Sequence, residues 1–194
     1  MSAENVTVKA APPKERILAT TRTLFYGHGI QATGVGELAE VAGVSKRTLY
    51  QLFESKDELV AAYLALMSQH GTTGERNLDR TELDARERLL ALFERPRLSA
   101  RFRGCPLHNA AVELADPDHP GRQVIVTHKH ALLAKLTDVG QQAGARRPAV
   151  LARQLITLYE GATALATSLD DVEPFDFARS AAETLIDAAV SAAG

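Results

Sequence analysis

The stretch "GVSKRTLYQLF", residues 43 to 53, combines a glycine, a serine and two basic residues with the apolar spacing of a helix. Gly43 is suited to end the preceding helix, and Ser45 is suited to cap the next one. Only three residues then separate two short helices, which is typical of a helix-turn-helix. Lys46 and Arg47 gain nothing from the partial positive charge at a helix N-terminus, so a negative partner outside the chain explains them better.

The segments on either side of this turn also have helical spacing. One helix is predicted to begin at Pro12 and to end at Gly29, and a short one follows with Thr33 or Gly34 as its cap. The residues expected to be buried on these two helices are Ile17, Leu18, Thr21, Leu24, Phe25, Val35, Leu38, Ala39 and Ala42. "SKDE", residues 55 to 58, predicts a capping box that opens a fourth helix.

The helix after the turn has an inward stripe and an outward polar face. The inward residues are Leu49, Leu52 and Phe53. The residues left to face outward are Lys46, Arg47, Thr48, Tyr50 and Gln51. A helix that presents its first turn to the major groove brings cations against base edges and phosphates, and a tyrosine hydroxyl can donate to a phosphate. A solvated basic face is the alternative, but the glycine-serine turn between two amphipathic helices favours DNA.

This part of the sequence resembles a known family. "ATGVGELAEVAGVSKRTLYQLFESKDEL", residues 32 to 59, is similar to the DNA-binding signature of the TetR family of bacterial transcriptional repressors. The resemblance implies recognition-helix contacts, a backbone anchor at Lys56, and a phosphate-facing start of the second helix at Thr33 and Gly34. When the cap residue Ser45 and the outward residue Gln51 are added, the candidate DNA contacts are Thr33, Gly34, Ser45, Lys46, Arg47, Thr48, Tyr50, Gln51 and Lys56. The resemblance also implies an all-helical homodimer whose larger C-terminal domain binds a small molecule.

Composition agrees with an all-α protein that contacts nucleic acid only locally. The chain of 194 residues has no tryptophan, one cysteine and a formal net charge of −2. Residues 1–57 hold seven Lys or Arg and six Asp or Glu, so a DNA-contacting surface there should be compact. The start of the chain has no signal-peptide pattern, and no apolar run approaches the roughly 20 residues that span a bilayer. We therefore expect a cytoplasmic protein with no membrane partner.

Three regions are predicted along the chain. Residues 1–11 are expected to form a flexible tail, residues 12–55 a helix-turn-helix DNA-binding domain, and residues 56–194 a helical domain for effector binding and dimerisation. No nucleophile-base pattern, phosphate loop or catalytic carboxylate pair is present in the sequence. We expect no enzymatic activity and no cofactor.

The C-terminal region divides into further segments. The helix from "SKDE" should end near His70, and "GTTGERN", residues 71 to 77, is predicted to be a loop. A helix capped by Thr81 is expected to bury Leu89, Leu90 and Phe93. "RPRLSARFRGCP", residues 95 to 106, is an irregular basic connector. A short helix from Pro106 ends at "DPDHPG", and a long one, from about Arg122 to Gln142, is expected to bury Ile125, Leu132, Leu136 and Val139.

Two final helices are predicted, at about 147–169 and 175–192. Their apolar and small residues form two stripes, made of Leu151, Leu155, Leu158, Ala162 and Leu165, and of Ala178, Ala181, Ala182, Leu185, Ile186 and Ala189. A protein that binds a two-fold symmetric DNA site has to be a dimer, and the family resemblance places the dimer interface on these helices. We expect a homodimer through a four-helix interface, with an ordinary intrachain core as the alternative.

Several residues are candidates for an effector site in the C-terminal region. A small, largely apolar effector with one or two polar atoms would suit Leu66, Phe93, Cys105, His108, Asn109, His128 and Tyr159. For any single one of them, packing in the core is the favoured interpretation, and we expect at least two of the set to line the effector site. His128 and His130 point apart on a helix, so we expect no metal site. Cys105 lies near basic residues and could instead serve a thiol-based redox regulator, although a buried apolar role is favoured. A fold relative that binds a small molecule without regulating transcription is the other alternative.

Overall fold

The computed structural model describes residues 11–96 and 102–191, and these residues form helices and no strand. They pack as two compact units. The first contains the chain up to His70 together with Pro106–Val126, and the second contains Gly71–Cys105 together with the chain from Thr127 onward. The predicted all-α fold is confirmed. Residues 1–10 of the expected tail and residues 97–101 of the expected basic connector lie outside the described residues.

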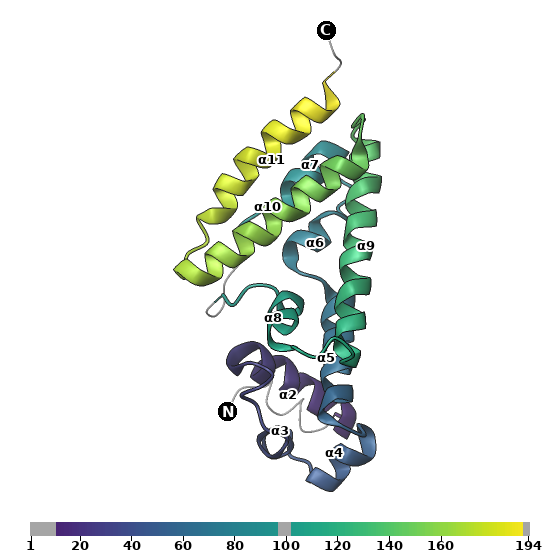
Figure 1. Cartoon of the computed structure of the whole chain (residues 1–194), viewed down its shortest axis with the longest axis vertical. Coiled ribbons are helices and arrows are strands. Elements are labelled where there is room, and N and C mark those ends of the chain that lie inside the picture. The colour runs from purple at the N-terminus through teal and green to yellow at the C-terminus, as the bar shows by residue number, and fades with distance from the viewer. Residues whose placement is uncertain (1–10, 97–101, 192–194) are drawn as a thin grey trace. The chain divides into compact units, whose positions relative to one another are not determined.

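The first unit contains the predicted helix-turn-helix. Its helices are α2 (Pro13–His28), α3 (Val35–Val41), α4 (Lys46–Leu52), α5 (Lys56–His70) and α8 (Pro106–Glu113), drawn in Figure 1. Gly29 ends α2 with a φ of 99°, a conformation that glycine adopts without steric cost. The helix boundaries around the turn therefore agree with those expected from the sequence.

A small apolar core holds these helices together. Fully or almost fully buried side chains come from every helix of the motif: Ile17, Leu24, Phe25, Leu38, Ala39, Leu49, Phe53, Leu59 and Tyr63. Phe25 of α2 and Tyr63 of α5 meet edge to face with ring centroids 5.3 Å apart. This core fixes α4 through Leu49, so the rest of that helix can face outward.

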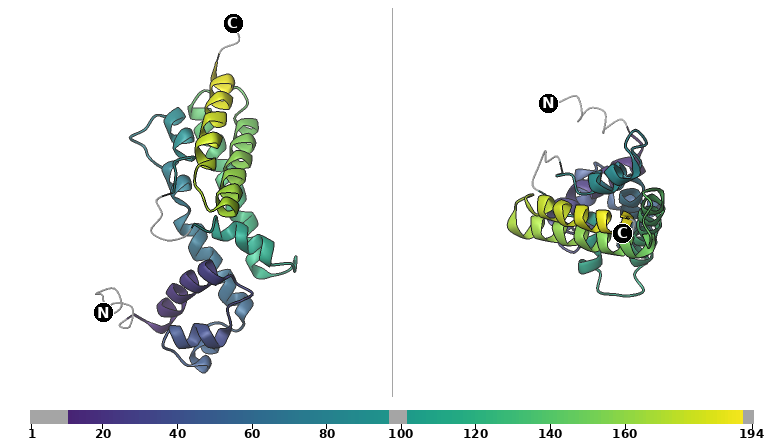
Figure 2. Two further views of the ribbon diagram at one scale, coloured as in Figure 1. Left: turned by 90° about the vertical axis from the view of Figure 1, so that its left-hand side faces the viewer. Right: turned by 90° about the horizontal axis from the view of Figure 1, so that it is seen from above.

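The second unit is built around two long C-terminal helices. Its helices are α6 (Thr73–Asn77), α7 (Ala85–Ala91), α10 (Pro148–Leu169) and α11 (Pro174–Val190), and most of α9 (Pro120–Gln142) belongs to it as well. Figures 1 and 2 show α10 and α11 running side by side along most of their length. The long helix α9 begins two residues before the predicted Arg122, because Pro120 suits the first turn of a helix.

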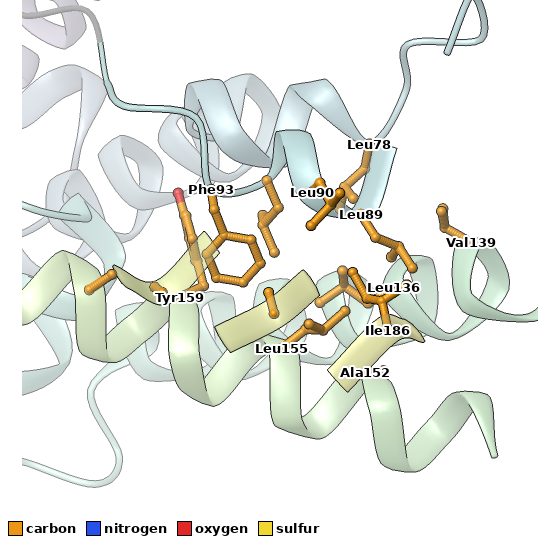
Figure 3. Packing of buried hydrophobic residues seen from close by; sticks show 14 of the residues in the cluster. Leu78, Leu89, Leu90, Phe93, Leu136, Val139, Ala152, Leu155, Tyr159 and Ile186 are labelled. Atoms are coloured by element: carbon orange, nitrogen blue, oxygen red, sulfur yellow. The ribbon is translucent and has the colours of Figure 1, made fainter. Parts of the chain in front are cut away.

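Large apolar side chains fill the space between α7, α9, α10 and α11. Phe93 and Tyr159 meet edge to face, with ring centroids 6.1 Å apart, and Figure 3 shows them together at one end of the cluster. Leu89, Leu136 and Ile186 lie toward the other end of that view. The predicted burial of Leu89, Leu90, Phe93 and the four apolar residues of α9 is confirmed.

Two predictions about the second unit are wrong. The segment "GTTGERN" is not a loop, because residues 73–77 form α6 with a capping box between Thr72 and Glu75. The helix expected to be capped by Thr81 is capped by Asp84, whose side chain accepts from the Glu87 N–H. In both cases a reciprocal cap between two residues three positions apart fixes the helix start.

The two expected apolar stripes on α10 and α11 are partly used within the chain. Leu151, Leu155 and Ala162 on α10, and Ala178, Ala182 and Ile186 on α11, are buried in the core of the second unit. For these residues, the structure shows the alternative that sequence analysis left open, which is packing in the core of the same chain. Other apolar residues of the same helices remain exposed, notably Leu165, Leu169 and Phe177. No helix in the described part of the chain is long and apolar enough to cross a membrane.

Candidate nucleic-acid interface

The turn between α3 and α4 is fixed by its own backbone. Gly43 has a φ of 63°, its N–H donates to the Glu40 carbonyl, and the Val44 N–H donates to the Ala39 carbonyl. This pair of bonds is a Schellman motif, which satisfies the last carbonyls of α3. The Arg16 guanidinium on α2 donates to the Gly43 carbonyl at 2.7 Å. The turn is thus tied to the helix that packs behind it.

The first turn of α4 is closed by Ser45. Its hydroxyl accepts from the Thr48 N–H at 3.0 Å and lies 2.9 Å from the Thr48 hydroxyl. Leu49 is buried one residue later. A side-chain cap of this kind stabilises a helix by about 1 kcal/mol. The cap and the buried leucine together set the rotation of α4 about its axis.

That rotation turns the predicted polar residues outward. Lys46, Arg47 and Gln51 are exposed, Thr48 is half-buried, and half of the Tyr50 surface is accessible. The Lys46 stem lies along α3, where a Cβ at Gly36 would approach its Cε to 3.1 Å. Two cations, a phenol hydroxyl and an amide on one exposed face can bind phosphates and base edges.

Gly34 and Thr33, the expected phosphate-facing pair, differ from each other. Gly34 is the cap residue of α3 and is exposed. Thr33 is fully buried, and its hydroxyl donates to the Gly29 carbonyl at 2.7 Å. The loop after Gly29 therefore folds the Thr33 side chain inward, and a phosphate contact at Thr33 and Gly34 stays a prediction for the start of α3.

Lys56 is held inside the same unit. Its ammonium donates to the Ile30 carbonyl at 2.7 Å, so the first turn of α5 is bonded to the loop between α2 and α3. The predicted cap of α5 is present, since the Ser55 hydroxyl accepts from the Glu58 N–H. The Glu58 carboxylate accepts from the Glu54 N–H, one residue earlier than a capping box requires.

Two family models match this chain. Residues 17–63 match the model of bacterial regulatory proteins of the tetR family, and residues 85–182 match the model of the tetracyclin repressor-like C-terminal domain. The chain belongs to the TetR family. The expected family membership is confirmed over both parts of the chain.

Named relatives of this TetR-family chain are transcriptional regulators rather than enzymes. It is 42% identical over 82 residues to the HTH-type transcriptional activator FasR of Mycolicibacterium smegmatis, a match that covers 41% of this chain and 36% of FasR. It is 31% identical over 100 residues to the HTH-type transcriptional regulator TtgR of Pseudomonas putida, covering 49% of this chain and 48% of TtgR. The chain thus matches less than half the length of these curated relatives.

A solved structure resembles the TetR-family chain over nearly its whole length. This Streptomyces avermitilis protein, assigned to the TetR transcriptional regulators, is 37% identical, with a TM-score of 0.81. The similarity covers 92% of this chain and 98% of the other. The similarity to this solved structure therefore extends over both units and is not limited to the helix-turn-helix.

The candidate effector residues are divided between the two units. Leu66, His108 and Asn109 belong to the first and are half-buried. Phe93, Cys105, His128 and Tyr159 belong to the second and are buried. Cys105 forms no disulfide and has 1% of its surface exposed, as the favoured apolar role requires.

Buried and half-buried polar groups of the second unit pair with one another. His128 Nε2 lies 3.2 Å from Glu75 Oε1, and the Tyr159 hydroxyl lies 2.7 Å from that of Thr72. Lys129 is bonded to Glu160 on α10. His128 is therefore buried and hydrogen-bonded within the second unit. Within residues 11–96 and 102–191, no group of His, Cys, Asp and Glu is arranged to hold a metal ion.

The pKa values in this cluster follow from burial and pairing. Burial raises the pKa of Glu75, but bonds from His128 and the Thr72 N–H outweigh it, so this pKa lies below its ordinary value. Burial raises the pKa of the Tyr159 phenol. Burial lowers the pKa of Lys129, but the surrounding negative groups raise it further, and its net shift is upward. Glu75 and Lys129 are thus held in their charged forms.

The sequence did not single out Glu75, although a signal was present. Thr72 and Glu75 have the spacing of a capping box, which the two glycines of "GTTGERN" obscured. Glu113 was missed too. Its carboxylate accepts from the Gln31 N–H at 2.9 Å, and the two residues are 82 positions apart. No pattern of neighbouring residues in the sequence predicts a contact between residues so far apart.

Proposed function

We propose that this chain is a ligand-responsive transcriptional regulator that binds a double-stranded DNA operator through α4, in the cytoplasm. One observation carries the proposal: Lys46, Arg47 and Tyr50 are exposed on a helix whose cap and buried leucine fix its orientation. Ser45, Thr48 and Gln51 lie on the same helix or at its cap and are the neighbouring candidate contacts. The backbone of Gly34 at the start of α3 is the candidate for a flanking phosphate.

A homodimer through α10 and α11 is part of this proposal. Leu165 is 55% exposed and Phe177 is 68% exposed, and Leu169 is exposed at the end of α10. A side chain added at Gly161 on α10 would meet nothing within 4 Å, so another helix has room to approach there. Exposed apolar side chains on two adjacent long helices favour burial against a second copy. A two-fold dimer would read a palindromic operator.

The proposed effector is a small, largely apolar molecule with one or two polar atoms. The candidate contacts in the second unit combine the Phe93 ring with polar atoms of His128 and Tyr159. Binding would change operator affinity only to the extent that the ligand prefers one arrangement of the protein. We propose release from DNA, hence repression. FasR carries the name of an activator, so the regulated promoter has to be assayed with and without effector.

Selection of bound fragments from genomic DNA tests the proposal directly. The wild-type chain should enrich fragments that contain a palindrome, and Arg47→Ala should weaken binding to them by about 1–3 kcal/mol if Arg47 contacts a base. Arg153→Ala is the matched control, because Arg153 is an exposed arginine on α10 in the second unit. No enrichment by the wild type, or unchanged affinity when both Lys46 and Arg47 are replaced by alanine, would contradict the proposal.

A further inference from the structure

The loop between α2 and α3 contains one peptide group that is held at both edges by opposite charges. The carbonyl of Ile30 accepts from the Lys56 ammonium at 2.7 Å. The N–H of the same peptide group, on Gln31, donates to the Glu113 carboxylate at 2.9 Å. Lys56 comes from the start of α5 and Glu113 from the end of α8. Bonds to charged groups are stronger than those between neutral partners, so this peptide plane is firmly oriented.

Gly29 leaves room for the carboxylate. It has a φ of 99°, and a Cβ built on it would lie 3.3 Å from both carboxylate oxygens of Glu113. A larger residue would be strained by its backbone and would crowd Glu113 at once. Thr33 closes the same loop from its other end through its bond to the Gly29 carbonyl. Three bonds therefore fix the chain between the end of α2 and the cap of α3.

Glu113 is itself held in place. It is the last residue of α8, and Ala110, three residues before it, and Leu114, directly after it, are buried. The Arg122 guanidinium donates to the carbonyls of Ala111 and Leu114, at 3.2 Å and 2.7 Å, and so satisfies the end of this helix. The carboxylate of Glu113 is thus presented to Gln31 by an ordered helix end.

We propose that Glu113 is a positioning residue for DNA binding, which acts by fixing the Ile30–Gln31 peptide group and with it α3 and the turn to α4. This inference rests on the proposed function. It makes α8 a working part of the DNA-binding unit, although α8 lies outside residues 17–63 and within the segment that matches the C-terminal family model. The grouping of Pro106–Val126 with the helix-turn-helix supports the same assignment.

The sign of one mutational effect distinguishes positioning from electrostatics. A carboxylate near bound DNA repels phosphates, so its removal by itself tightens binding. Loss of a positioning contact weakens binding instead. Glu15 on α2 is an exposed carboxyl of the same unit, so Glu15→Gln removes an equal charge and reports the electrostatic effect alone.

The test measures affinity of the full chain for a selected DNA fragment. We expect Glu113→Ala to bind about tenfold more weakly than wild type, since a charge-assisted hydrogen bond is lost. The affinity of Glu113→Gln should lie between those of wild type and Glu113→Ala, because its amide oxygen still accepts a hydrogen bond. Glu15→Gln should bind as tightly as wild type or more tightly. Amide hydrogen exchange should be faster at Gln31 in Glu113→Ala than in wild type.

The outcomes separate this inference from the function on which it rests. If the wild-type chain binds the selected fragment and Glu113→Ala binds it with equal or higher affinity, the inference is overturned and the proposed function stands. A wild-type chain that binds no selected fragment would overturn the proposed function and the inference with it. If Glu113→Ala does not fold, the comparison of Glu113→Gln with Glu15→Gln decides, and weaker binding by the former supports positioning.

Discussion

At the scale of single residues, the cations near the turn occupy two different environments. Lys46 and Arg47 are exposed on α4, whereas the ammonium of Lys56 is bonded to the Ile30 carbonyl. A cation that neutralises a phosphate releases counterions, and one whose ammonium stays on the loop carbonyl and meets no phosphate releases none. The salt dependence of DNA binding therefore separates the two roles.

Replacing Lys46 by alanine should reduce the steepness of log affinity against log salt by about one. Lys56→Ala should weaken binding at every salt concentration and leave that slope unchanged, because it loosens the loop before α3. Fluorescence anisotropy of a labelled operator across a salt series measures both. A slope reduced equally in the two variants would place Lys56 on a phosphate.

Glu75 should make the free energy of unfolding depend on pH in the acidic range. Its pKa lies below the ordinary value of 4.5, so the unfolded chain takes up this proton at a higher pH than the folded chain. Its stabilising contribution is complete above about pH 4.5 and is lost as the pH falls toward the lower folded value. Glu75→Gln should cost about 2 kcal/mol at neutral pH and should flatten this acid dependence.

Urea unfolding between pH 3 and 7 measures both effects of the Glu75 change. Glu54→Gln is a suitable control, since Glu54 is exposed. An equal acid dependence in wild type and Glu75→Gln would show that the bond to His128 contributes no such stability.

The outward residues of α4 could be predicted because helical spacing decides them. Leu49 has to be buried, and Lys46, Arg47 and Gln51 then face away from the core. The inward position of Thr33 could not be predicted in the same way. It depends on the left-handed turn at Gly29, which changes the direction of the chain before α3.

At the scale of helices, α10 and α11 carry two kinds of apolar residue. One set packs in the core of the second unit and the other is exposed. Leu158 and Leu185 are partly buried against the intrachain core, so a charge at either would disturb folding as well as association. Leu165 is exposed and offers a cleaner test of the proposed dimer.

Leu165→Glu should convert the dimer to a monomer, because it would bury an unpaired charge in the interface at a cost of several kcal/mol. The helical content of the monomer should be retained. Ala131→Glu adds the same charge to an exposed alanine on α9, away from the two helices of the proposed interface, and should leave the dimer intact. Light scattering measures the mass, and a dimeric Leu165→Glu protein would move the interface away from this residue.

Helix boundaries were predictable where a cap and an apolar run occur together. The starts of α4 and α8 and the end of α2 follow from Ser45, Pro106 and Gly29. The helix α6 was missed because two glycines within four consecutive positions suggest a loop. Close packing explains one of them, since a Cβ at Gly74 would lie 2.3 Å from the Leu92 carbonyl oxygen.

At the scale of the whole molecule, the chain segments do not follow the units. Pro106–Val126 packs with the helix-turn-helix although the segments before and after it belong to the second unit. A division drawn along the sequence at one residue cannot describe such an arrangement. Contacts between distant residues, such as Glu113 with Gln31, create it, and periodicity within one helix carries no information about them.

The effector response should depend on the buried polar groups of the second unit. Once a compound that releases the protein from DNA is found, Tyr159→Phe should shift its effective concentration by about tenfold, the typical cost of a lost hydrogen bond. Operator affinity without ligand should be unchanged. Thr157→Val is the control, since Thr157 is an exposed hydroxyl on the same helix. Unchanged ligand dependence in both Tyr159→Phe and His128→Ala would place the effector elsewhere.

The clamped peptide group between Ile30 and Gln31 also decides what can be exchanged between related proteins. A graft of residues 12–55 would carry the complete recognition turn but would leave behind both Lys56 and Glu113. The recipient would have to offer an ammonium and a carboxylate at matching places, or the transplanted turn would lose its support. A functional chimaera therefore needs two pieces of this chain, with α8 transferred together with the helix-turn-helix.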